Sequence, residues 1–363
     1  MKGLEFPLIS TEVKSLPAGG QGLTKRYNLN DPKERQAYFE VKAGDEIKKI
    51  RKYLENNTFV AFLIGKKNSG KSTYSVLFSE IFGSQKSALV SVGDIIREIH
   101  TNWDKFRKSQ DFEELKRLYR GYISFEKAID AFLGRSTEKL LPTEFVLALL
   151  KLHIAKIGKK AIFIDGLPRG VDQVSYSLYF RDLINFRDDP DLFILIDIPE
   201  AVIDERLKYR LVCPLCRSSR NLKLLPTSKI GFDEKKKKFY LLCDNPNCKG
   251  TKMEAKEGDE LGIGPIRSRL MKDEEIIKTV FGLYGVPKIL LRNHVSVKEA
   301  SQYFDDYELT PEYVLRWDEK GKKVVVKEKP WSVKDDNGVE SYSLLADPVV
   351  VVLLKQLVEV LNI

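Results

Sequence analysis

Short apolar runs separated by longer amphipathic stretches form the main pattern of the first half of the chain. The runs are residues 59–64, 88–91, 161–164 and 192–197. Each has the length and the apolar content of a buried strand. Helical stretches lie between them, one that starts at residue 70 and a long one from 95 to 157. Strands that alternate with helices predict an α/β fold with a parallel sheet.

The N-terminal part, before this alternation, divides into two segments. Residues 1–30 are rich in Gly, Pro and polar residues and predict an irregular extension. Asp31-Pro32 then supplies an N-cap and a first-turn proline to a charged helix that ends near Asn57. Neither segment contains a motif that indicates a function.

The C-terminal part departs from the alternation after residue 300. The stretch "YVLRWDEKGKKVVVKE" predicts a hairpin that turns at residues 319–321. Asp347-Pro348 is predicted to cap a final amphipathic helix. The pattern does not place a fifth strand of the core sheet.

Composition narrows the class of protein. A chain of 363 residues that is 43% hydrophobic and 31% charged can bury a large core, so we expect a soluble globular protein of two or three structural units. The N-terminus does not resemble a secretion signal, and the densest apolar run, at 348–354, is too short to span a bilayer. The four cysteines all lie between 213 and 248, which does not suit a disulfide framework. We therefore expect a monomer in the reducing cytoplasm, with no membrane partner.

The net charge of +9 is concentrated in one segment. Residues 208–256 contain thirteen Lys or Arg and four Asp or Glu, so the rest of the chain is close to neutral. A local basic segment indicates an anionic partner. The alternative is that "DEKKKK" at 233–238 is simply a solvated turn.

The sequence between the first apolar run and the next helix matches the phosphate-binding pattern G-x-x-x-x-G-K-[ST]. Its glycines let backbone N–H groups turn toward phosphate oxygens at a helix N-terminus. A chance match in a surface loop is the alternative, but the flanking strand argues against it. The residues predicted to bind a nucleoside triphosphate are Gly65, Asn68, Ser69, Gly70, Lys71, Ser72 and Thr73.

Three further stretches follow in order, each at a strand end or a helix start: "SVGDIIRE" at 91–98, "FIDGLPRGVDQ" at 163–173 and "DERLKYRLVC" at 204–213. With the phosphate-binding loop they resemble the adenylate kinase family of nucleoside monophosphate kinases, over about residues 59 to 272. The resemblance implies transfer of phosphate from Mg²⁺-bound ATP to AMP.

It also implies a domain plan, namely a P-loop three-layer α/β/α core with a helical insert for the monophosphate and a lid over ATP. The expected ranges are an extension at 1–57, a core of 58–206 and 257–300 that includes the insert at 95–150, a lid at 207–256 and a C-terminal extension at 301–363.

The resemblance assigns roles residue by residue. Taken singly, Arg97, Arg206 and Arg210 have the alternative of being surface charges on helices, and only their registration with the loops argues against it. Arg97 and Arg169 would hold the acceptor phosphate, Arg206 would stack on the ATP base, and Arg210 and Arg269 would meet the transferring phosphoryl group. The implied catalytic residues are Lys71, Arg97, Arg169, Arg210 and Arg269. The implied AMP-binding residues are Val92, Gly93, Arg97, Leu140, Leu141, Gly166, Arg169, Gln173 and Arg269, and the implied magnesium residues are Ser72, Asp94 and Asp165.

The four cysteines fall where this family inserts its lid. Cys213-x₂-Cys216 and Cys243-x₄-Cys248 form two short pairs that suit one tetrahedral Zn²⁺. Four thiolates leave no open coordination position, so the predicted metal is structural. Unligated buried thiols are the alternative.

Three points stay open at this stage. A further family arginine has no clear counterpart, and Lys256 and Arg267 are the candidates to replace it. Gln173 favours AMP as the acceptor, whereas Val92 is typical of the pyrimidine branch, so a UMP or CMP kinase is the runner-up.

The third open point is the class of protein. A P-loop protein whose zinc module binds nucleic acid is less favoured, because the lid has few aromatic residues, essentially Phe232, Phe239 and Tyr240. A relative that has lost activity is the remaining alternative.

Overall fold

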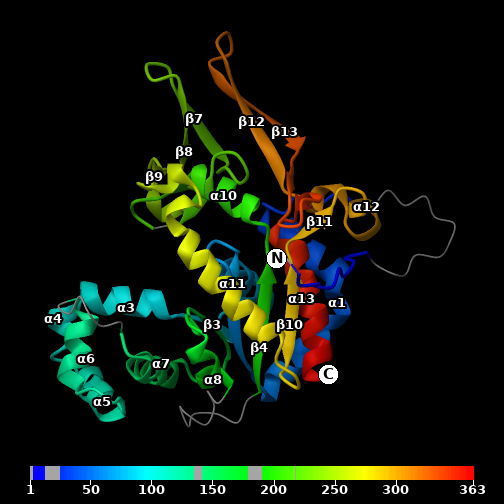
Figure 1. Ribbon diagram of the computed structural model, residues 1–363. Helices are drawn as coiled ribbons and strands as arrows, with labels where there is room; N and C mark the ends of the chain where they lie inside the picture. Colours follow the sequence, from blue (N-terminus) through cyan, green and yellow to red (C-terminus); the bar gives the residue numbers. More distant parts are fainter. Residues whose placement is uncertain (1–2, 13–24, 135–140, 179–189, 217) are drawn as a thin grey trace.

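The computed structural model describes residues 3–12, 25–134, 141–178, 190–216 and 218–363. A five-stranded sheet lies at its centre, with all neighbouring strands parallel and in the order β10-β4-β1-β3-β2 (Figure 1). The strands are β1 (Val60–Gly65), β2 (Ser87–Ser91), β3 (Ala161–Asp165), β4 (Asp191–Asp197) and β10 (Lys288–Arg292). The first four confirm the predicted strands to within one residue at each end. β10 is the edge strand that the sequence pattern did not place.

Helices cover both faces of this sheet, which confirms the predicted three layers. Side chains alternate along β1, so that Ala61 and Leu63 pack into one hydrophobic cluster while Phe62 and Ile64 pack into the other. The first cluster contains α1 (Pro32–Asn56), α2 (Lys71–Phe82) and α13 (Ala346–Leu361). The second contains α3 (Val92–Thr101), α7 (Thr143–Ile157) and α11 (Arg267–Phe281).

The helical stretch expected from 95 to 157 is divided into several helices. Between α3 and α7 lie α4 (Trp103–Phe106), α5 (Gln110–Leu118) and α6 (Phe125–Phe132). One break is local in origin, because the Ser124 side chain accepts a hydrogen bond from Lys127 N and so caps a new helix start. The remaining core helices are α8 (Asp172–Leu178) and α10 (Glu200–Lys208). In the described part of the chain, no helix combines the length and the apolar character needed to cross a membrane.

The two predicted helix caps have different outcomes. Asp31 caps α1 as expected, since its side chain accepts from Lys33 N and Glu34 N. Asp347, however, does not cap α13, because that helix already begins at Ala346 with Leu345 as its N-cap. Asp347 lies in the first turn, where its carboxylate is buried and faces Arg35 at 3.8 Å.

The segment between α10 and α11 folds into small antiparallel sheets. One contains β5 (Arg210–Val212), β6 (Ser219–Asn221) and β9 (Glu254–Ala255), and the other is the hairpin of β7 (Lys229–Asp233) and β8 (Lys238–Leu242). Three short 3₁₀ turns complete it, η1 (Pro246–Cys248), η2 (Asp259–Leu261) and η3 (Gly264–Ile266).

The chain between β10 and α13 adds a further module. Its elements are β11 (His294–Ser296), α12 (Ala300–Tyr303), η4 (Asp306–Glu308), β12 (Pro311–Asp318), β13 (Lys323–Pro330), β14 (Ser332–Lys334) and β15 (Glu340–Ser343). β12 and β13 pair in register from Pro311 with Pro330 to Asp318 with Lys323, which confirms the predicted hairpin and its turn.

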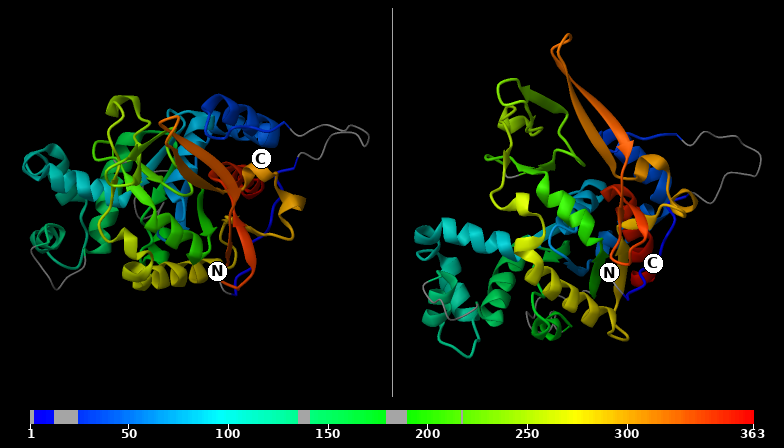
Figure 2. Two further views of the ribbon diagram at one scale, coloured as in Figure 1. Left: turned by 90° about the horizontal axis from the view of Figure 1, so that it is seen from above. Right: turned by 45° about the horizontal axis from the view of Figure 1, so that its top comes forward.

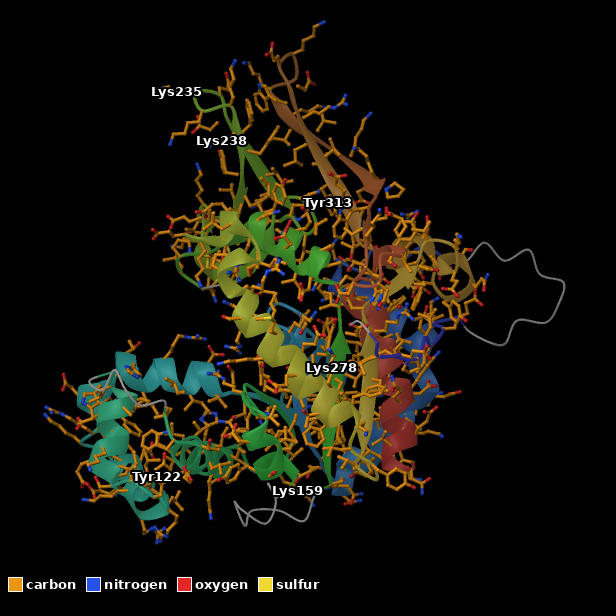
Figure 3. All side chains as sticks on the ribbon, viewed as in Figure 1. Tyr122, Lys159, Lys235, Lys238, Lys278 and Tyr313 are labelled. Atoms are coloured by element: carbon orange, nitrogen blue, oxygen red, sulfur yellow. The ribbon has the colours of Figure 1, made fainter. Side chains whose placement is uncertain are left out.

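Two long hairpins, β7–β8 and β12–β13, project side by side from the same end of the molecule (Figures 1 and 2). The rings of Phe232 and Trp317 stack across the gap with centroids 5.0 Å apart. Nearer the base, Tyr313 N donates to Lys223 O at 2.7 Å. Figure 3 labels Lys238 on the first hairpin and Tyr313 on the second. The C-terminal module therefore contacts the cysteine-containing segment directly.

Candidate active site

The loop between β1 and α2 is shaped to surround an anion. Its backbone is left-handed at Asn68 (φ 64°) and Gly70 (φ 100°), and a Cβ on Gly65 would lie 2.6 Å from Ser69 Oγ. Asn68 Nδ2 and Ser69 Oγ are buried without a hydrogen-bond partner among the described residues. Because an unpaired buried polar atom is costly, these atoms fit a bound polar ligand. Thr73 lies just beyond the loop, exposed in the first turn of α2.

Lys71 is the first residue of α2, and its side chain reaches back across the loop. Its Nζ donates to Gly65 O at 2.8 Å and to Lys66 O at 3.2 Å. Burial lowers the pKa of Lys71, and the carboxylates of Asp165 and Asp273 oppose that shift. The ammonium group is therefore held in the loop by oxygen atoms that phosphate oxygens can replace.

Two of the three residues predicted to bind magnesium, Ser72 and Asp165, are in contact. Ser72 Oγ donates to Asp165 Oδ2 at 3.4 Å, because Asp165 ends β3 opposite Leu63 of β1. A hydroxyl beside a carboxylate is a hard-oxygen set that fits Mg²⁺. The third, Asp94, is exposed in the first turn of α3 and forms an ion pair with Arg97. The ion-pair partner of Asp94 is thus an arginine, and the Ser72–Asp165 contact forms separately.

The two arginines predicted for the acceptor phosphate lie over the same glycine. A Cβ on Gly93 would be 3.4 Å from Arg169 Nη2 and 3.8 Å from Arg97 Nη1. Gly166, with φ 97°, leaves room for Arg169, since a Cβ there would approach Nη2 to 2.9 Å. Val92 is buried at the start of α3. The two guanidinium groups are thus placed to bind one anion together.

The other predicted arginine pair meets the phosphate-binding loop from α10 and β5. Arg206 Nη1 donates to Asn68 O at 3.2 Å, and its Nη2 donates to Asn293 Oδ1 at 3.4 Å. Burial lowers the pKa of Arg206. Arg210 forms a bidentate ion pair with Asp259, at 2.6 and 2.7 Å, and also donates to Asn68 Oδ1 at 3.3 Å.

Arg269 joins the loop through an acidic residue that sequence analysis did not single out. Its Nε donates to Asp273 Oδ1 at 3.1 Å, and Asp273 Oδ2 accepts from Lys67 N at 3.0 Å. The available signal was the i,i+4 spacing of Arg269 and Asp273 on one helix. Burial lowers the pKa of Lys67, and the charge of Lys256 lowers it further. Of the two candidates for the missing arginine, Lys256 is therefore the one whose charge acts on the loop.

Cations outnumber carboxylates at the centre of this site. Burial lowers the pKa of Arg169, and Arg269 adds to the effect, which shows how closely the positive groups are packed. The positive groups that act on one another here are Lys71, Arg97, Arg169 and Arg269, and the negative groups are Asp165 and Asp273. Such a site suits polyanionic ligands and can stabilise charge on a transferring phosphoryl group.

Gln173 is engaged inside the protein. Its Oε1 accepts from Arg169 N at 2.8 Å, and its Nε2 donates to Thr143 Oγ1 at 3.0 Å. Of the two leucines predicted to line the acceptor pocket, Leu141 is half-buried, and Leu140 lies outside the described residues.

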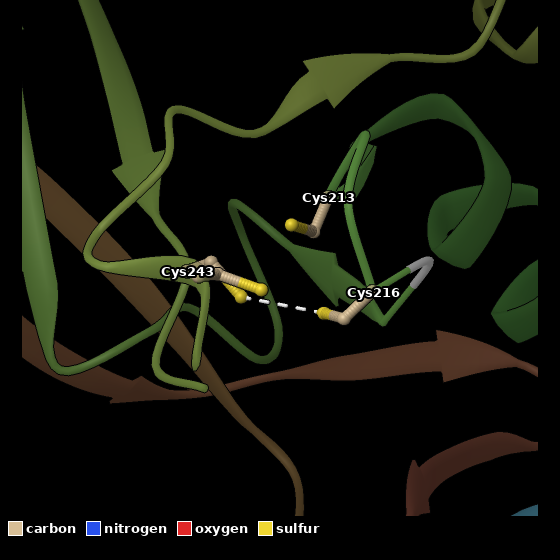
Figure 4. Close-up of side chains that lie close together, drawn as sticks. Cys213, Cys216 and Cys243 are labelled. Atoms are coloured by element: carbon tan, nitrogen blue, oxygen red, sulfur yellow. Dashed lines mark hydrogen bonds between the residues drawn. The ribbon is translucent and has the colours of Figure 1, made fainter. Parts of the chain in front are cut away.

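The four cysteines form a second centre, at the junction of β5, β8 and η1 (Figure 4). They are free thiols, and the four Sγ atoms all lie within 4.8 Å of one another. Cys216 Sγ and Cys243 Sγ are 3.6 Å apart. Cys213 N donates to Ser218 O, and Cys243 N donates to Thr251 O, each at 2.9 Å, so two tight turns present the pairs. Convergent thiols of this kind fit a tetrahedral zinc ion.

Curated adenylate kinases are similar to this chain, although no protein-family model matches it. The adenylate kinase of Mycoplasma mobile is 29% identical over 167 residues, which is 45% of this chain and 69% of that protein. The adenylate kinase of Mycoplasma mycoides subsp. mycoides is 26% identical over 215 residues, 59% of this chain and 82% of that protein. The one from Thermotoga petrophila is 30% identical over 169 residues, 46% of this chain and 65% of that protein. These similarities support the resemblance of the chain to the adenylate kinase family.

Proposed function

We propose that this chain, which its curated relatives indicate to be a phosphotransferase of the nucleoside monophosphate kinase type, is an adenylate kinase that converts ATP and AMP into two ADP. The observation that carries the proposal is the convergence of Lys71, Arg169 and Arg269 beside Asp165, at the carboxyl ends of β1 and β3. Phosphoryl transfer needs little covalent chemistry, so catalysis depends on positioning and on stabilising negative charge.

The donor nucleotide would lie on the loop and α10. The loop N–H groups and Lys71 would hold the β- and γ-phosphates, and Arg206 would face the base. Ser72 and Asp165 would hold Mg²⁺, which shields phosphate charge when it is bound. We propose Asp94 as a residue of the same shell only through ordered water, because its direct partner is Arg97.

The acceptor would lie on the other side of the transferred group. Arg97 and Arg169 would bind the phosphate of AMP over Gly93. Arg210 and Arg269 would contact the transferring phosphoryl group, and each must first be released in part from a carboxylate. Lys256 would supply the positive charge of the missing arginine.

A coupled assay of ADP formation with AMP, dAMP, CMP, UMP and GMP tests the proposal. We expect AMP and dAMP to give the highest kcat/KM, because the Gln173 amide can pair with an adenine edge. A preference for CMP or UMP would instead support the pyrimidine kinase reading that Val92 favours. Absence of ADP with every acceptor would overturn the kinase proposal altogether.

We also propose that residues 207–256 act as the lid and residues 95–150 as the acceptor cap. The four cysteines would hold a structural Zn²⁺ that joins the two halves of the lid. This metal would stabilise the fold and take no part in the chemical step, since four thiolates fill its coordination sphere.

A cavity on the β7–β8 hairpin supports nucleic-acid binding as a second candidate function. It has a volume of about 190 Å³ and is lined by aromatic, apolar and basic side chains, among them Lys236, Lys238, Lys252, Phe239 and Tyr240. Bases that stack on aromatic rings beside lysines are typical of single-stranded nucleic-acid sites. A gel shift with single-stranded RNA and DNA at two salt concentrations tests this candidate, and no shift at low salt would exclude it.

A further inference from the structure

Lys66, the second residue of the phosphate-binding loop, carries a buried charge. Only 1% of its side chain is exposed. An ammonium group removed from water must be paired, because an isolated buried charge costs several kcal/mol. The partners of Lys66 therefore help to fix the position of the loop.

Three carboxylates from three different parts of the chain surround Lys66. Its Nζ lies 3.0 Å from Glu200 at the start of α10, 3.2 Å from Glu274 on α11 and 3.3 Å from Asp336. Burial by itself lowers the pKa of Lys66, but Asp336, Glu200 and Glu274 together raise it above its usual value, so the ammonium stays charged. Asp336 belongs to the turn between β14 and β15, in the C-terminal module outside the family resemblance.

The same carboxylate also holds the start of α10. Asp336 Oδ1 accepts from Glu200 N at 2.8 Å, one of the free N–H groups in the first turn of that helix. The helix carries Arg206, and Arg210 follows directly after it. One side chain of the C-terminal module thus links the phosphate-binding loop to the helix that positions two donor-site arginines.

The turn that presents Asp336 is itself well fixed. Asp335 Oδ1 accepts from Asn337 N and Val339 N, both at 2.9 Å. Just before β14, Trp331 packs in a hydrophobic cluster with Val202, Ile203 and Leu207 of α10. This packing anchors the module to α10. The fixed carboxylate of Asp336 therefore helps to hold Lys66, and with it the loop, in place.

We propose that Asp336 is a positioning residue of the donor-nucleotide site, which makes the C-terminal module part of the ATP-binding machinery. The inference rests on the proposed function, in which ATP lies on the loop and α10. Asp336 contacts Lys66 of the phosphate-binding loop and Glu200 of α10, and both of these residues lie on the donor side of the proposed site. The acceptor-side groups have other contacts: Arg97 pairs with Asp94, and Gln173 bonds Arg169 N and Thr143 Oγ1. Loss of Asp336 should therefore change the response to ATP and leave the response to AMP almost unchanged.

Two variants separate the two links that Asp336 makes. Asp336→Asn keeps an oxygen that can accept from Glu200 N but removes the charge next to Lys66. Asp336→Ala removes both links. Lys66 keeps Glu200 and Glu274 as counter-ions in either variant, so we expect both to fold. Asn337→Ala, at the exposed neighbouring position of the same turn, is the matched control.

The readouts are KM for ATP, KM for AMP and the melting temperature. We expect Asp336→Ala to raise KM for ATP by about tenfold, with KM for AMP changed by less than about twofold. Asp336→Asn should lie between Asp336→Ala and the wild type, and Asn337→Ala should match the wild type. A lowered melting temperature with both KM values changed equally would mean a merely structural role and would overturn the inference, as would two unchanged KM values.

Calorimetric titration with a non-hydrolysable Mg²⁺–ATP analogue separates this inference from the proposed function. A wild type that binds the analogue but forms no ADP would overturn the kinase proposal, while weaker binding by Asp336→Ala would still support the positioning role. Equal binding by wild type and Asp336→Ala would overturn the positioning role alone. If Asp336→Ala fails to fold, Asp336→Asn carries the same comparison.

Discussion

The positive groups of the site are held at rest by groups of the protein itself. Lys71 bonds loop carbonyl oxygens, Arg210 bonds Asp259, and Arg269 bonds Asp273. Under the proposed function, a bound nucleotide would exchange these partners for phosphate oxygens. At the residue scale, the proposed binding is a competition between oxygen atoms of the protein and of the phosphates for the same cations, which would keep the buried charges paired in both states.

Replacement of Lys71 by methionine tests the central cation. Methionine has a similar length and no charge, so it fills much of the same space while it removes the ammonium group and its hydrogen bonds to Gly65 O and Lys66 O. We expect kcat to fall by about a hundredfold or more, because the lost interaction is strongest when charge develops on the transferring phosphoryl group. Coupled assays measure this loss, and an unchanged melting temperature shows that the fold survives. Near-normal turnover by the folded variant would contradict the assigned role.

Gln173→Ala tests the acceptor base. The amide now bonds Arg169 N and Thr143 Oγ1, so it must turn toward an adenine when AMP binds. We expect the variant to raise KM for AMP by about tenfold and to change KM for ATP much less. Because Gln173 also supports Arg169, Gln173→Glu is a useful second variant that keeps the oxygen acceptor. Equal changes in both KM values would show that Gln173 does not read the base.

Among the elements, the last helix carries an ionisable group with an unusual environment. Burial raises the pKa of Asp347 to about 7, and Arg35 opposes that shift only in part. Asp347 Oδ1 has no hydrogen-bond partner in the described structure. The folded state therefore prefers the neutral carboxyl group, whereas the unfolded chain ionises it near its ordinary pKa of 3.8.

The sign of the pH effect follows from that difference. Asp347 lowers the free energy of unfolding progressively as the pH rises from about 4 to about 7, because ionisation in the fold is costly. Asp347→Asn cannot ionise, so its stability relative to the wild type should improve between pH 4 and pH 8 by about 2 to 4 kcal/mol. Urea unfolding of both proteins at the two pH values measures this difference. A constant difference would show that Asp347 is already ionised in the fold at low pH.

The cysteine-containing sheets form an element with little hydrophobic core of its own. Its buried cluster consists of Leu241, Met253 and cysteines 213, 243 and 248. We predict that the purified protein contains about one zinc ion per chain, since metal binding would supply the folding free energy that this small cluster lacks. A chelator or Cys243→Ser should lower the melting temperature more than Lys71→Met does. Metal analysis without zinc, together with no thermal response to chelation, would count against the zinc site.

At the scale of the whole molecule, the C-terminal module connects the cysteine-containing segment, the proposed lid, to the core. Its β12–β13 hairpin contacts the lid through the stacked rings of Phe232 and Trp317, and Glu312 lies 3.8 Å from Lys223, which also pairs with Glu205 of α10. We expect these contacts to limit the motion of the lid hairpin.

Trp317→Ala tests this coupling. The variant removes the aromatic contact between the hairpins, next to the β12–β13 turn. Amide hydrogen exchange in residues 229–242 should become faster, while the melting temperature changes little, because the module remains anchored at its base. Val326→Ala, at an exposed position of the same hairpin, is the control. Unchanged exchange in the lid would show that the hairpins do not restrain each other.

The sequence by itself determined the central sheet and the loop at its centre. Four strands and the loop at Gly65–Ser72 were predictable, because strand periodicity and glycine-rich turns depend on residues close together along the chain. The three layers were expected from the family resemblance. The β12–β13 turn and the Asp31 cap follow from the same local rules. The gathering of Arg97 and Arg169 was expected only through the family resemblance, whose motifs fix the spacing between distant segments.

Only the tertiary structure decided which groups pair across long separations. Asp273 next to Lys67, Asp336 next to Lys66 and Trp317 against Phe232 join positions tens to hundreds of residues apart. No local pattern records such pairs, because each carboxylate or ring is an ordinary surface residue in its own segment. β10 and the start of α13 escaped prediction for the same reason, since packing against the sheet, and not local propensity, sets where they begin.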